Sequence, residues 1–412
     1  MPTLPRSRIK DPVKIVIAPD SFKEGLDAAA VARAIAQGVG DVMPHADIVC
    51  IPMADGGEGT VNTILAATSG ERRCTLVQDA LGAPVEASWG WVPPATAVIE
   101  MAAAAGLELI APQRRAVLRA SSYGVGELIL AALESGARRI VLGLGGSATN
   151  DGGAGMLTAL GARFLDADGA AVPLGGAALA QLASIDLSGL DPRLAQTQLI
   201  VASDVNTPLC GPDGAAAVFG PQKGATAADV KQLDSALARY ASIAARTIGR
   251  DVSQVPGAGA AGGLGFAASA FLHGRFRPGV EVVAELVGLR QAVAGADLLF
   301  TGEGCLDAQT LHGKAPAGVA RIAREAGVPV VALVGALGPG HERLAEAGIT
   351  AAFSIVSGPM SLDEAYRQTA ELLRARAREV MRLYVAFSRP APHCAGATAL
   401  PDPHPSAHPQ DG

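Results

Sequence analysis

The chain has 412 residues, of which 49% are hydrophobic, 4% are aromatic and 50 are glycine. This composition is typical of a globular enzyme-sized protein and excludes a disordered, collagen-like or coiled-coil chain. A net charge of -6, with 33 Lys and Arg against 39 Asp and Glu, argues against a nucleic-acid binder, which normally carries a basic face.

The first apolar runs predict parallel strands that each lead into a helix. Residues 14–19 form a short apolar run that ends in a turn, Ala-rich residues 28–39 predict the helix after it, and residues 47–52 predict the next strand. Such strand and helix repeats are typical of an α/β sheet with right-handed crossovers.

Between residues 72 and 100 the pattern changes to closely spaced short strands. They are expected at 72–78, 85–92 and 97–100, separated by Gly-Ala-Pro and Pro-Pro turns, and predict an antiparallel portion. Further strands are predicted at 139–144, 199–203, 297–300, 328–333 and 351–356, and a long helix at 361–383.

These elements predict a discontinuous α/β domain, residues 13–80 plus 285–387, into which a second α/β domain, residues 81–284, is inserted. Residues 388–412 are rich in Pro, His and Ala and predict a disordered tail. The five cysteines contain no CxxC, and no apolar run approaches the ~18 residues of a membrane helix. We therefore expect a cytoplasmic protein that binds neither membranes nor nucleic acid.

The strongest local signal is the glycine-rich loop within Leu142–Met156, between a predicted strand and a predicted helix. Its glycines would lie at a helix amino terminus, where backbone N–H groups bind phosphate oxygens. The loop is neither a Walker loop nor a GxGxxG fingerprint, and a tight turn without a ligand is the alternative. We predict that it binds nucleotide phosphates through Gly145, Gly146, Ser147, Thr149, Asn150, Asp151, Gly152 and Gly153.

Four other predicted strand ends carry an acid beside small residues. The acids are Asp20, Asp55, Glu58, Asp204, Glu303 and Asp307. Ligands of open α/β sheets bind outside the carboxyl ends of the strands, so these loops are candidates for one shared site. Phosphoryl transfer uses phosphate-binding N–H groups, lysines, carboxylates that hold magnesium and a carboxylate that accepts a hydroxyl proton. For any single acid, the alternative is a helix cap or a turn residue.

Lysines are rare among the cations of this chain, and three of them, Lys23, Lys223 and Lys314, lie in loops that contain Gly or Pro. A lysine fixed in such a loop indicates a positioned point charge. A second glycine-rich run, residues 256–265, is equally consistent with a ligand-facing loop and with a hinge or helix-packing segment.

Seven motifs together resemble those of the bacterial glycerate kinase family, type 1 (glycerate 2-kinase-like), with matching order and spacing from about residue 13 to residue 383. They are APDSFK (18–23), PMADGGEGT (52–60), SYGVGE (122–127), GGSATNDGGAG (145–155), VFGPQKG (218–224), PGAGAAGGLG (256–265) and TGEG (301–304). The resemblance implies ATP-dependent phosphorylation of D-glycerate to 2-phosphoglycerate or 3-phosphoglycerate, with ADP release and Mg²⁺. It also implies a flavodoxin-like (Rossmann-like) portion plus a second α/β domain, with the active site between them.

Under this resemblance each candidate residue receives a role. Catalytic roles are expected for Asp20, Lys23, Lys223, Asp307 and Lys314, substrate binding for Asp55 and Glu58, and metal binding for Asp204 and Glu303. Asp307 or Asp20 is favoured over Asp55 as the general base. Cys305 stands where the family usually has Arg, which leaves the partner of the substrate carboxylate open. Two alternatives remain, a nucleotide-dependent oxidoreductase and a non-catalytic binding protein for a small hydroxy acid.

Overall fold

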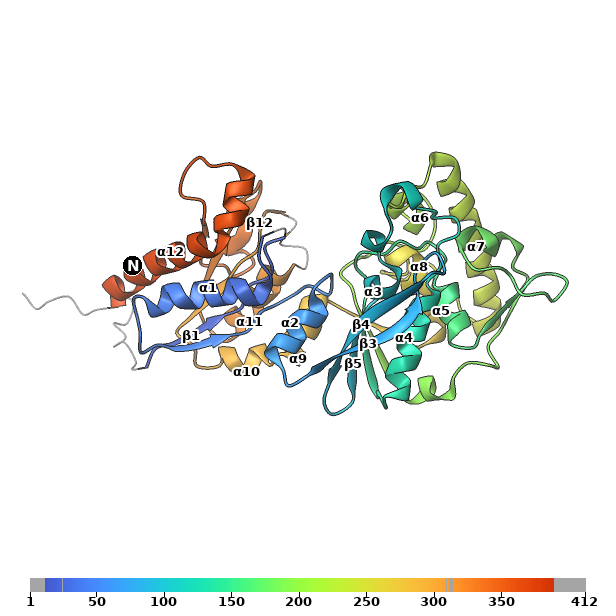
Figure 1. Cartoon of the computed structure of the whole chain (residues 1–412), viewed down its shortest axis with the longest axis horizontal. Helices are drawn as coiled ribbons and strands as arrows, with labels where there is room; N and C mark the ends of the chain where they lie inside the picture. The colour runs from blue at the N-terminus through green and yellow to red at the C-terminus, as the bar shows by residue number, and fades with distance from the viewer. Residues whose placement is uncertain (1–11, 24, 309, 311–313, 389–412) are drawn as a thin grey trace, which may run out of the picture.

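The computed structural model describes residues 12–388 except for 24, 309 and 311–313, and it contains two α/β units, each built on a sheet (Figure 1). Of the predicted tail, only Ser388 lies within the described residues, where it ends the last helix. None of the helices in this described part is long and apolar enough to cross a membrane.

The first sheet has five parallel strands. In spatial order they are β15 (Ala351–Ser354), β13 (Val330–Val334), β11 (Leu298–Thr301), β1 (Lys14–Ile17) and β2 (Asp47–Cys50). Counted along the chain within this sheet, the order is 2-1-3-4-5, which is one of the two common orders of doubly wound sheets and that of flavodoxin. Ile15 lies between Ile48 and Leu298 in the register. The predicted α/β class is therefore confirmed.

Alternating side chains of the first sheet enter two different hydrophobic layers, because successive residues of a strand point to opposite faces. Ile15 and Ile17 pack beneath α1 (Ala28–Gly40) and α12 (Leu362–Ser388), which lie side by side although they are far apart in the sequence (Figure 1). Gly38 permits this approach, since a Cβ there would lie 2.3 Å from the carbonyl oxygen of Arg374. The opposite face is covered by α2 (Thr60–Ala67), α9 (Gly279–Leu286), α10 (Leu289–Val293) and α11 (Ala315–Glu325).

The second sheet has six strands of mixed direction. In spatial order they are β10 (Arg275–Arg277), β9 (Gln198–Ala202), β6 (Arg139–Gly143), β5 (Thr96–Glu100), β4 (Pro84–Val92) and β3 (Glu71–Gln78). The run from β10 to β5 is parallel, and β3 and β4 continue it as antiparallel strands. The predicted antiparallel portion is confirmed. The expected boundary at residue 80 assigned residues 71–78 to the first domain, whereas β3 pairs with β4 along its whole length and belongs to the second sheet.

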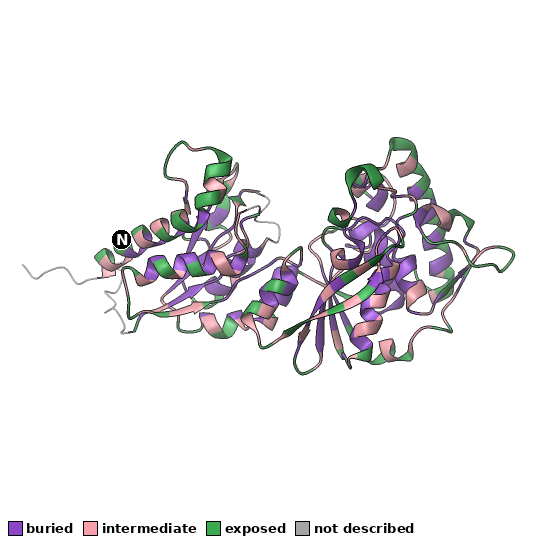
Figure 2. Ribbon diagram, in the orientation of Figure 1, coloured by how far each residue is buried: buried purple, intermediate pink, exposed green. Residues whose placement is uncertain are grey.

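One face of the second sheet is covered by helices of its own unit, and the central strands β5, β6 and β9 are largely buried (Figure 2). These helices are α3 (Ala102–Ala105), α4 (Tyr123–Glu134), α5 (Ala154–Ala159), α6 (Ala215–Phe219), α7 (Ala227–Ile248) and α8 (Ala260–Phe271). On the other face, Val98 and Val141 belong to the same hydrophobic cluster as Val16 and Leu299 of the first sheet. In Figure 1, α2 and α9 lie between the two units, which therefore share apolar packing.

Short elements complete the described chain. They are the strand pairs β7 (Arg163–Leu165) with β8 (Ser184–Asp186) and β12 (Cys305–Leu306) with β14 (Ala336–Leu337), and the 3-10 helices η1 (Leu107–Leu109), η2 (Pro112–Arg114), η3 (Gly176–Gln181), η4 (Pro192–Gln196), η5 (Pro221–Lys223) and η7 (His341–Ala345).

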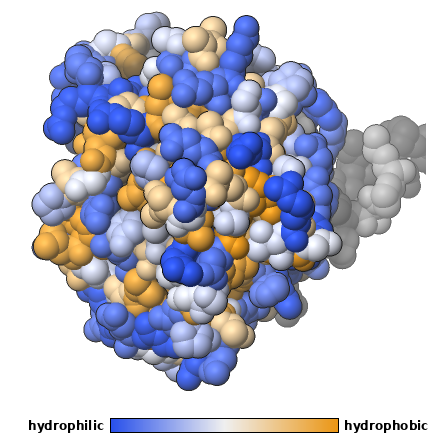
Figure 3. Space-filling view, turned by 90° about the vertical axis from the view of Figure 1, so that its right-hand side faces the viewer, coloured by the Kyte–Doolittle hydropathy of each residue, from blue (hydrophilic) through white to orange (hydrophobic). Residues whose placement is uncertain are grey.

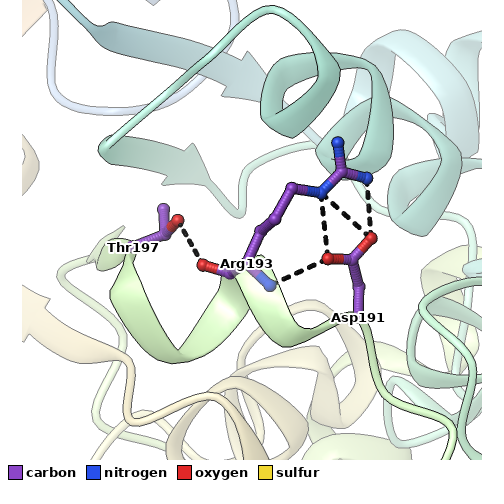
Figure 4. A network of polar contacts seen from close by, with 3 residues as sticks. All are labelled: Asp191, Arg193 and Thr197. Atoms are coloured by element: carbon purple, nitrogen blue, oxygen red, sulfur yellow. Dashed lines mark hydrogen bonds and ion pairs between the residues drawn. The ribbon is translucent and has the colours of Figure 1, made fainter.

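A capped turn fixes the start of β9. Asp191 accepts hydrogen bonds from the backbone N–H of Arg193 at 2.9 Å and from its guanidinium, and Thr197 donates to the carbonyl of Arg193 at 2.9 Å (Figure 4). This network lies at the amino end of β9, opposite to the end that leads into Asp204. On the right-hand end of the molecule, hydrophobic residues are interspersed with hydrophilic ones (Figure 3).

Candidate active site

A cleft of about 860 Å³ lies where loops from the two units meet. The first unit contributes Lys23 after β1, the loop 55–59 after β2 and Lys314 before α11, and the second contributes loops that follow β6 and β9. Of the residues predicted from the sequence, Lys23, Asp55, Glu58, Gly145, Gly146, Ser147, Asp204 and Lys314 line it. Carboxyl ends of strands from both sheets thus form one concave site, as the rule for open α/β sheets leads one to expect.

The front of the glycine loop faces this cleft and lies against the backbone of a neighbouring loop. A Cβ at Gly145 would lie 3.0 Å from the Cα of Gly57, and Gly146 has a positive φ of 71°. The loop is held from the other side by Leu107, whose N–H donates to the carbonyl of Gly146 at 2.8 Å. Gly145, Gly146 and Ser147 therefore present backbone and hydroxyl groups to the cleft.

The back of the same loop is buried and does not line the cleft. Thr149, Asn150 and Asp151 have no exposed surface, and a Cβ at Gly152 would lie 2.6 Å from the ring of Tyr240. The expected helix amino terminus, that of α5, thus points into packed protein. Thr149, Asn150, Asp151, Gly152 and Gly153 lie behind the residues that face the cleft.

Asp151 is a structural anchor for this loop. Its Oδ2 accepts hydrogen bonds from the N–H of Ser122 at 2.8 Å, the hydroxyl of Ser122 at 2.9 Å and the N–H of Gly155 at 3.1 Å. Its Oδ1 accepts from the N–H of Gly153 at 3.1 Å. One carboxylate thus joins the loop to the start of α4 and satisfies four buried donors.

Lys223 supports the loop from inside the protein. Its side chain is only 1% exposed, and its Nζ donates to the Oγ of Ser147 at 2.8 Å and to the carbonyl of Thr149 at 2.7 Å. Burial lowers the pKa of Lys223 to about 7, and the charge of Asp151 opposes this decrease. The lysine holds Ser147, which lines the cleft, but does not line the cleft itself.

Asp55, which lines the cleft, influences carboxylates of both units, although Asp20 itself does not line the cleft. Burial, followed by the charge of Asp55, raises the pKa of Asp20 to about 7, although the N–H of Ser21 donates to Asp20 at 2.6 Å. Burial also raises the pKa of Asp204 to about 6, and the charge of Asp55 adds to the increase. Asp55 is thus electrostatically coupled to an acid of each unit, an arrangement that favours binding of cations and of hydroxyl donors.

Glu303 and Lys314 form an ion pair beside these acids. The Nζ of Lys314 lies 3.3 Å from the Oε2 of Glu303 and 4.0 Å from the Oδ1 of Asp307. The hydroxyl of Thr310 donates to the Oε1 of Glu303 at 2.6 Å. Burial raises the pKa of Glu303, whereas the hydrogen bond from Thr310 and the charge of Lys314 act to lower it. Lys314 immediately precedes α11, which fixes its backbone at the rim of the cleft.

Comparison with known proteins shows which family the chain belongs to. Residues 15–385 match the sequence profile of the Glycerate kinase family. A glycerate kinase of Halalkalibacterium halodurans is 50% identical over 367 residues, which cover 89% of this chain and 97% of that protein. The chain belongs to the glycerate kinase family. A glycerate 2-kinase of Escherichia coli K12 is 49% identical over 356 residues, covering 86% of this chain and 93% of that protein.

A solved structure extends the match to the fold of this family. A crystal structure of a candidate glycerate kinase 2 from Salmonella typhimurium LT2 has a TM-score of 0.83 and 47% identity, and covers 91% of this chain and 98% of that chain. The predicted family and kinase activity toward glycerate are therefore confirmed, and ATP is the donor that a kinase implies. The oxidoreductase and binding-protein alternatives lose their support.

For a glycerate kinase, the acids of the cleft fit a metal that is held jointly with the nucleotide. Among the residues the structure describes, no group of three or more His, Cys, Asp and Glu side chains could hold a metal ion by itself. Magnesium usually keeps several waters and binds one or two carboxylates plus substrate phosphates. Asp204, which follows β9, lines the cleft and suits that mode of binding, whereas Glu303, which follows β11, does not line the cleft and is paired with Lys314.

Sequence reasoning missed one end of the cleft and left a second loop undecided. Asn62, Arg72, Ser88 and Glu100 line the cleft, and the only sequence signal among them is that Glu100 ends a predicted strand. In the 256–265 run, Ala261 lines the cleft, whereas a Cβ at Gly262 would lie 2.0 Å from the carbonyl oxygen of Thr149. The run therefore faces the cleft at Ala261 and packs closely against the backbone of Thr149 at Gly262. Cys305 is exposed on β12 and does not line the cleft.

Proposed function

We propose that this enzyme transfers the γ-phosphoryl group of ATP to the 2-hydroxyl of D-glycerate and releases 2-phosphoglycerate and ADP. The observation that carries the proposal is one cleft that combines Gly145–Ser147 with Lys23, Lys314 and carboxylates of both units. Phosphoryl transfer depends almost entirely on positioning and charge stabilisation, and it needs this combination of groups. The choice of the 2-hydroxyl is supported by the name of the Escherichia coli relative, glycerate 2-kinase.

Each group has a distinct role in this proposal. Gly145, Gly146 and Ser147 bind the nucleotide phosphates, and Lys23 and Lys314 neutralise charge on the transferring group or on the substrate carboxylate. Asp20 accepts the hydroxyl proton of the substrate, because it lies three residues before the cleft residue Lys23 and is coupled to the charge of Asp55. A pKa near 7 is compatible with a general base at neutral pH. Asp307, the other candidate base, lies within reach of Lys314.

The remaining acids bind the substrate and the metal. Asp55 and Glu58 accept hydrogen bonds from substrate hydroxyl groups, and Asp204 and Glu303 would hold Mg²⁺. When bound, Mg²⁺ neutralises charge on the β- and γ-phosphate oxygens. Because Asp204 comes from the second unit and Glu303 from the first, we further propose that the units act as two domains. The second, from β3 to β10, is inserted into the first, flavodoxin-like one.

A coupled ADP-release assay tests the proposed reaction. D-Glycerate, L-glycerate and related hydroxy acids are supplied with ATP and Mg²⁺, and phosphorus NMR identifies the product. We expect release of ADP with D-glycerate and a 2-phosphoglycerate signal. An Asp191→Asn variant, altered at the amino end of β9 and away from the cleft, is the control and should keep the wild-type rate. Absence of stimulation by every hydroxy acid would overturn the proposal, and a 3-phosphoglycerate signal would overturn the 2-hydroxyl assignment.

A further inference from the structure

Four polar residues at one end of the cleft have no role in the proposed transfer. They are Asn62, Arg72, Ser88 and Glu100. Beside them α3 and η1 line the cleft with one acid, Glu108, and with the apolar residues Ala102, Ala103, Leu107 and Leu109. Clefts that bind small molecules typically combine an apolar lining with a few placed polar groups, so this end has the character of a ligand subsite.

The order of strands in the second sheet places these residues in line with the rest of the site. Asp204 follows β9, Gly145 follows β6 and Glu100 ends β5, while Ser88 lies in β4 and Arg72 in β3. Glu100 is paired with Gly143, the last residue of β6, and Arg72 with Gly90 of β4. Neighbouring strands lie about 4.8 Å apart. Moving along the sheet from β9 to β3 therefore leads from Asp204, past the phosphate-binding loop, to Glu100, Ser88 and Arg72, and Asn62 of α2 lies beside Arg72.

Contacts within this group join its members to one another. The Nη2 of Arg72 donates to the Oδ1 of Asn62 at 2.5 Å, and its Nη1 donates to the Oγ of Ser88 at 3.4 Å. The Oε1 of Glu100 accepts from the N–H of Val61, the second residue of α2, at 2.7 Å. These bonds orient Arg72 and Glu100 from α2 and from the neighbouring strand.

Glu100 keeps acceptor capacity at the wall of the cleft. Burial and the charge of Glu58 raise the pKa of Glu100, whereas its backbone N–H partners and the charge of Arg72 act to lower it. A carboxyl group has two oxygens that can accept hydrogen bonds, so Glu100 can bind a hydroxyl donor of a ligand while its Oε1 holds α2. A pair of vicinal hydroxyl groups is the matching donor set, and a nucleotide presents that pair on its ribose.

We propose that this end of the cleft is the nucleoside subsite of the enzyme. Glu100 accepts hydrogen bonds from the ribose hydroxyls, and the base lies between the apolar α3–η1 segment and the polar group of Asn62, Arg72 and Ser88. This inference rests on the proposed function, because the transferring phosphoryl group defines the direction of the nucleotide. With Asp204 after β9 and the phosphates at the β6 loop, the nucleoside extends toward β5, β4 and β3.

Calorimetric binding of three ligands tests the subsite without depending on turnover. The ligands are ATP, 2′-deoxyATP and inorganic tripolyphosphate, each with Mg²⁺. Loss of a hydrogen bond to a charged group corresponds to a factor of roughly 10 to 100 in affinity, so the wild-type enzyme should bind ATP about that much more tightly than 2′-deoxyATP. In Glu100→Ala this ratio should fall to about one to two, by the same reasoning, while the affinity for tripolyphosphate stays unchanged. Equal losses for ATP and 2′-deoxyATP, or a wild-type ratio near one, would overturn the assignment of Glu100.

Matched variants separate a local role from a structural one. Glu100→Gln keeps an acceptor for the Val61 N–H and should reduce the ATP to 2′-deoxyATP ratio if Glu100→Ala does not fold. Glu127→Ala is the control, since Glu127 accepts from the N–H of Gln78 at 2.7 Å and does not line the cleft. It should keep the wild-type ratio.

Arg73, the next residue in β3, provides a matched control for substitution of Arg72. Arg72→Ala should weaken ATP binding by about tenfold, equivalent to one hydrogen-bonding group, and leave tripolyphosphate unaffected. Arg73, whose guanidinium lies 4.5 Å from the ring centroid of Trp91, does not line the cleft, and Arg73→Ala should change neither. Equal effects of the two substitutions on ATP binding would overturn the place of Arg72 in the subsite.

The outcome also separates this inference from the proposed function. If ATP binds with the expected discrimination but D-glycerate is not phosphorylated, the proposed function fails and the subsite stands. If D-glycerate is phosphorylated while the Glu100 and Arg72 variants bind ATP as the wild type does, the subsite is wrong and the proposed function stands. Failure of the wild-type enzyme to bind ATP would overturn both.

Discussion

Lys223 Nζ lies 2.8 Å from the Oγ of Ser147, which joins a fully buried cation to a hydroxyl group at the wall of the cleft. The same ammonium group holds the carbonyl of Thr149 at 2.7 Å. The Nζ of Lys223 donates to these two loop oxygens and does not line the cleft. Lys223 therefore acts on a bound phosphate by fixing the conformation of the loop. It is a positioning residue by this geometry, although its place in the sequence suggested direct contact with the transferring group.

Replacement of Lys223 by Met tests this role. Met fills a similar volume without a charge to bury, so we expect the fold to persist, with a melting temperature within a few degrees of the wild type. Ser147 and Thr149 would lose their partner, and kcat/KM for ATP should fall by roughly 10- to 1,000-fold, in the range seen when groups that stabilise transferring charge are lost. Steady-state kinetics beside thermal unfolding measure both effects. Wild-type kcat/KM in a folded Lys223→Met enzyme would contradict the positioning role.

Asp151→Ala should damage the fold more than the chemistry. The substitution leaves four buried hydrogen-bond donors without their acceptor, and loss of a buried charged partner costs about 3 to 5 kcal/mol. We expect a clearly lower free energy of unfolding, measured with urea. Asp166→Ala is the control, because Asp166 accepts the N–H groups of Asp168 and Ala170 in an exposed turn. A similar small effect of both substitutions would show that Asp151 is not an anchor.

The sequence was sufficient to predict features that depend on local pattern. Short apolar runs such as 14–19 and 139–144 correspond to β1 and β6, because a strand buried on both faces must be apolar throughout. The acids that follow β1, β9 and β11 could be recognised as candidates because the carboxyl ends of parallel strands meet at one edge of a sheet. Resemblance to glycerate kinases supplied the reaction that these patterns leave open.

Features that depend on tertiary packing could not be predicted in this way. Nothing in GGSATNDGGAG distinguishes Gly145, which faces the cleft, from Gly152, which packs against Tyr240. Likewise Arg72 and Glu100 are 28 positions apart in the chain. Both line the same end of the cleft only because β4 lies between β3 and β5 in the sheet. Such juxtapositions depend on which strands pair, and periodicity contains no information on that choice.

Asp20→Asn should remove a titration from the activity profile. With the pKa of Asp20 at about 7, kcat/KM of the wild type should increase as pH rises through 7, because the base must be ionised to accept a proton. The variant should lose about 100- to 10,000-fold in kcat, the usual contribution of a general base, and the increase near pH 7 should be absent. Asp27→Asn, altered at the exposed amino-terminal cap of α1, is the control for substitution of an aspartate. If Asp307→Asn removes the increase and Asp20→Asn keeps it, Asp307 is the base.

The stability of the enzyme should depend on pH in two opposite ways, because Asp20 and Lys223 have displaced pKa values of different sign. The pKa of Asp20 is raised from 3.8 to about 7, so between these values the folded state binds more protons and stability falls as pH rises. The pKa of Lys223 is lowered from 10.5 to about 7, so above pH 7 the unfolded state binds more protons and stability rises with pH. We expect Asp20→Asn to weaken the decrease between pH 4 and 7, and Lys223→Met to weaken the increase between pH 7 and 10. Urea unfolding of the wild type and both variants across this range measures the slopes, and unchanged slopes in a variant would show that its residue does not titrate as described.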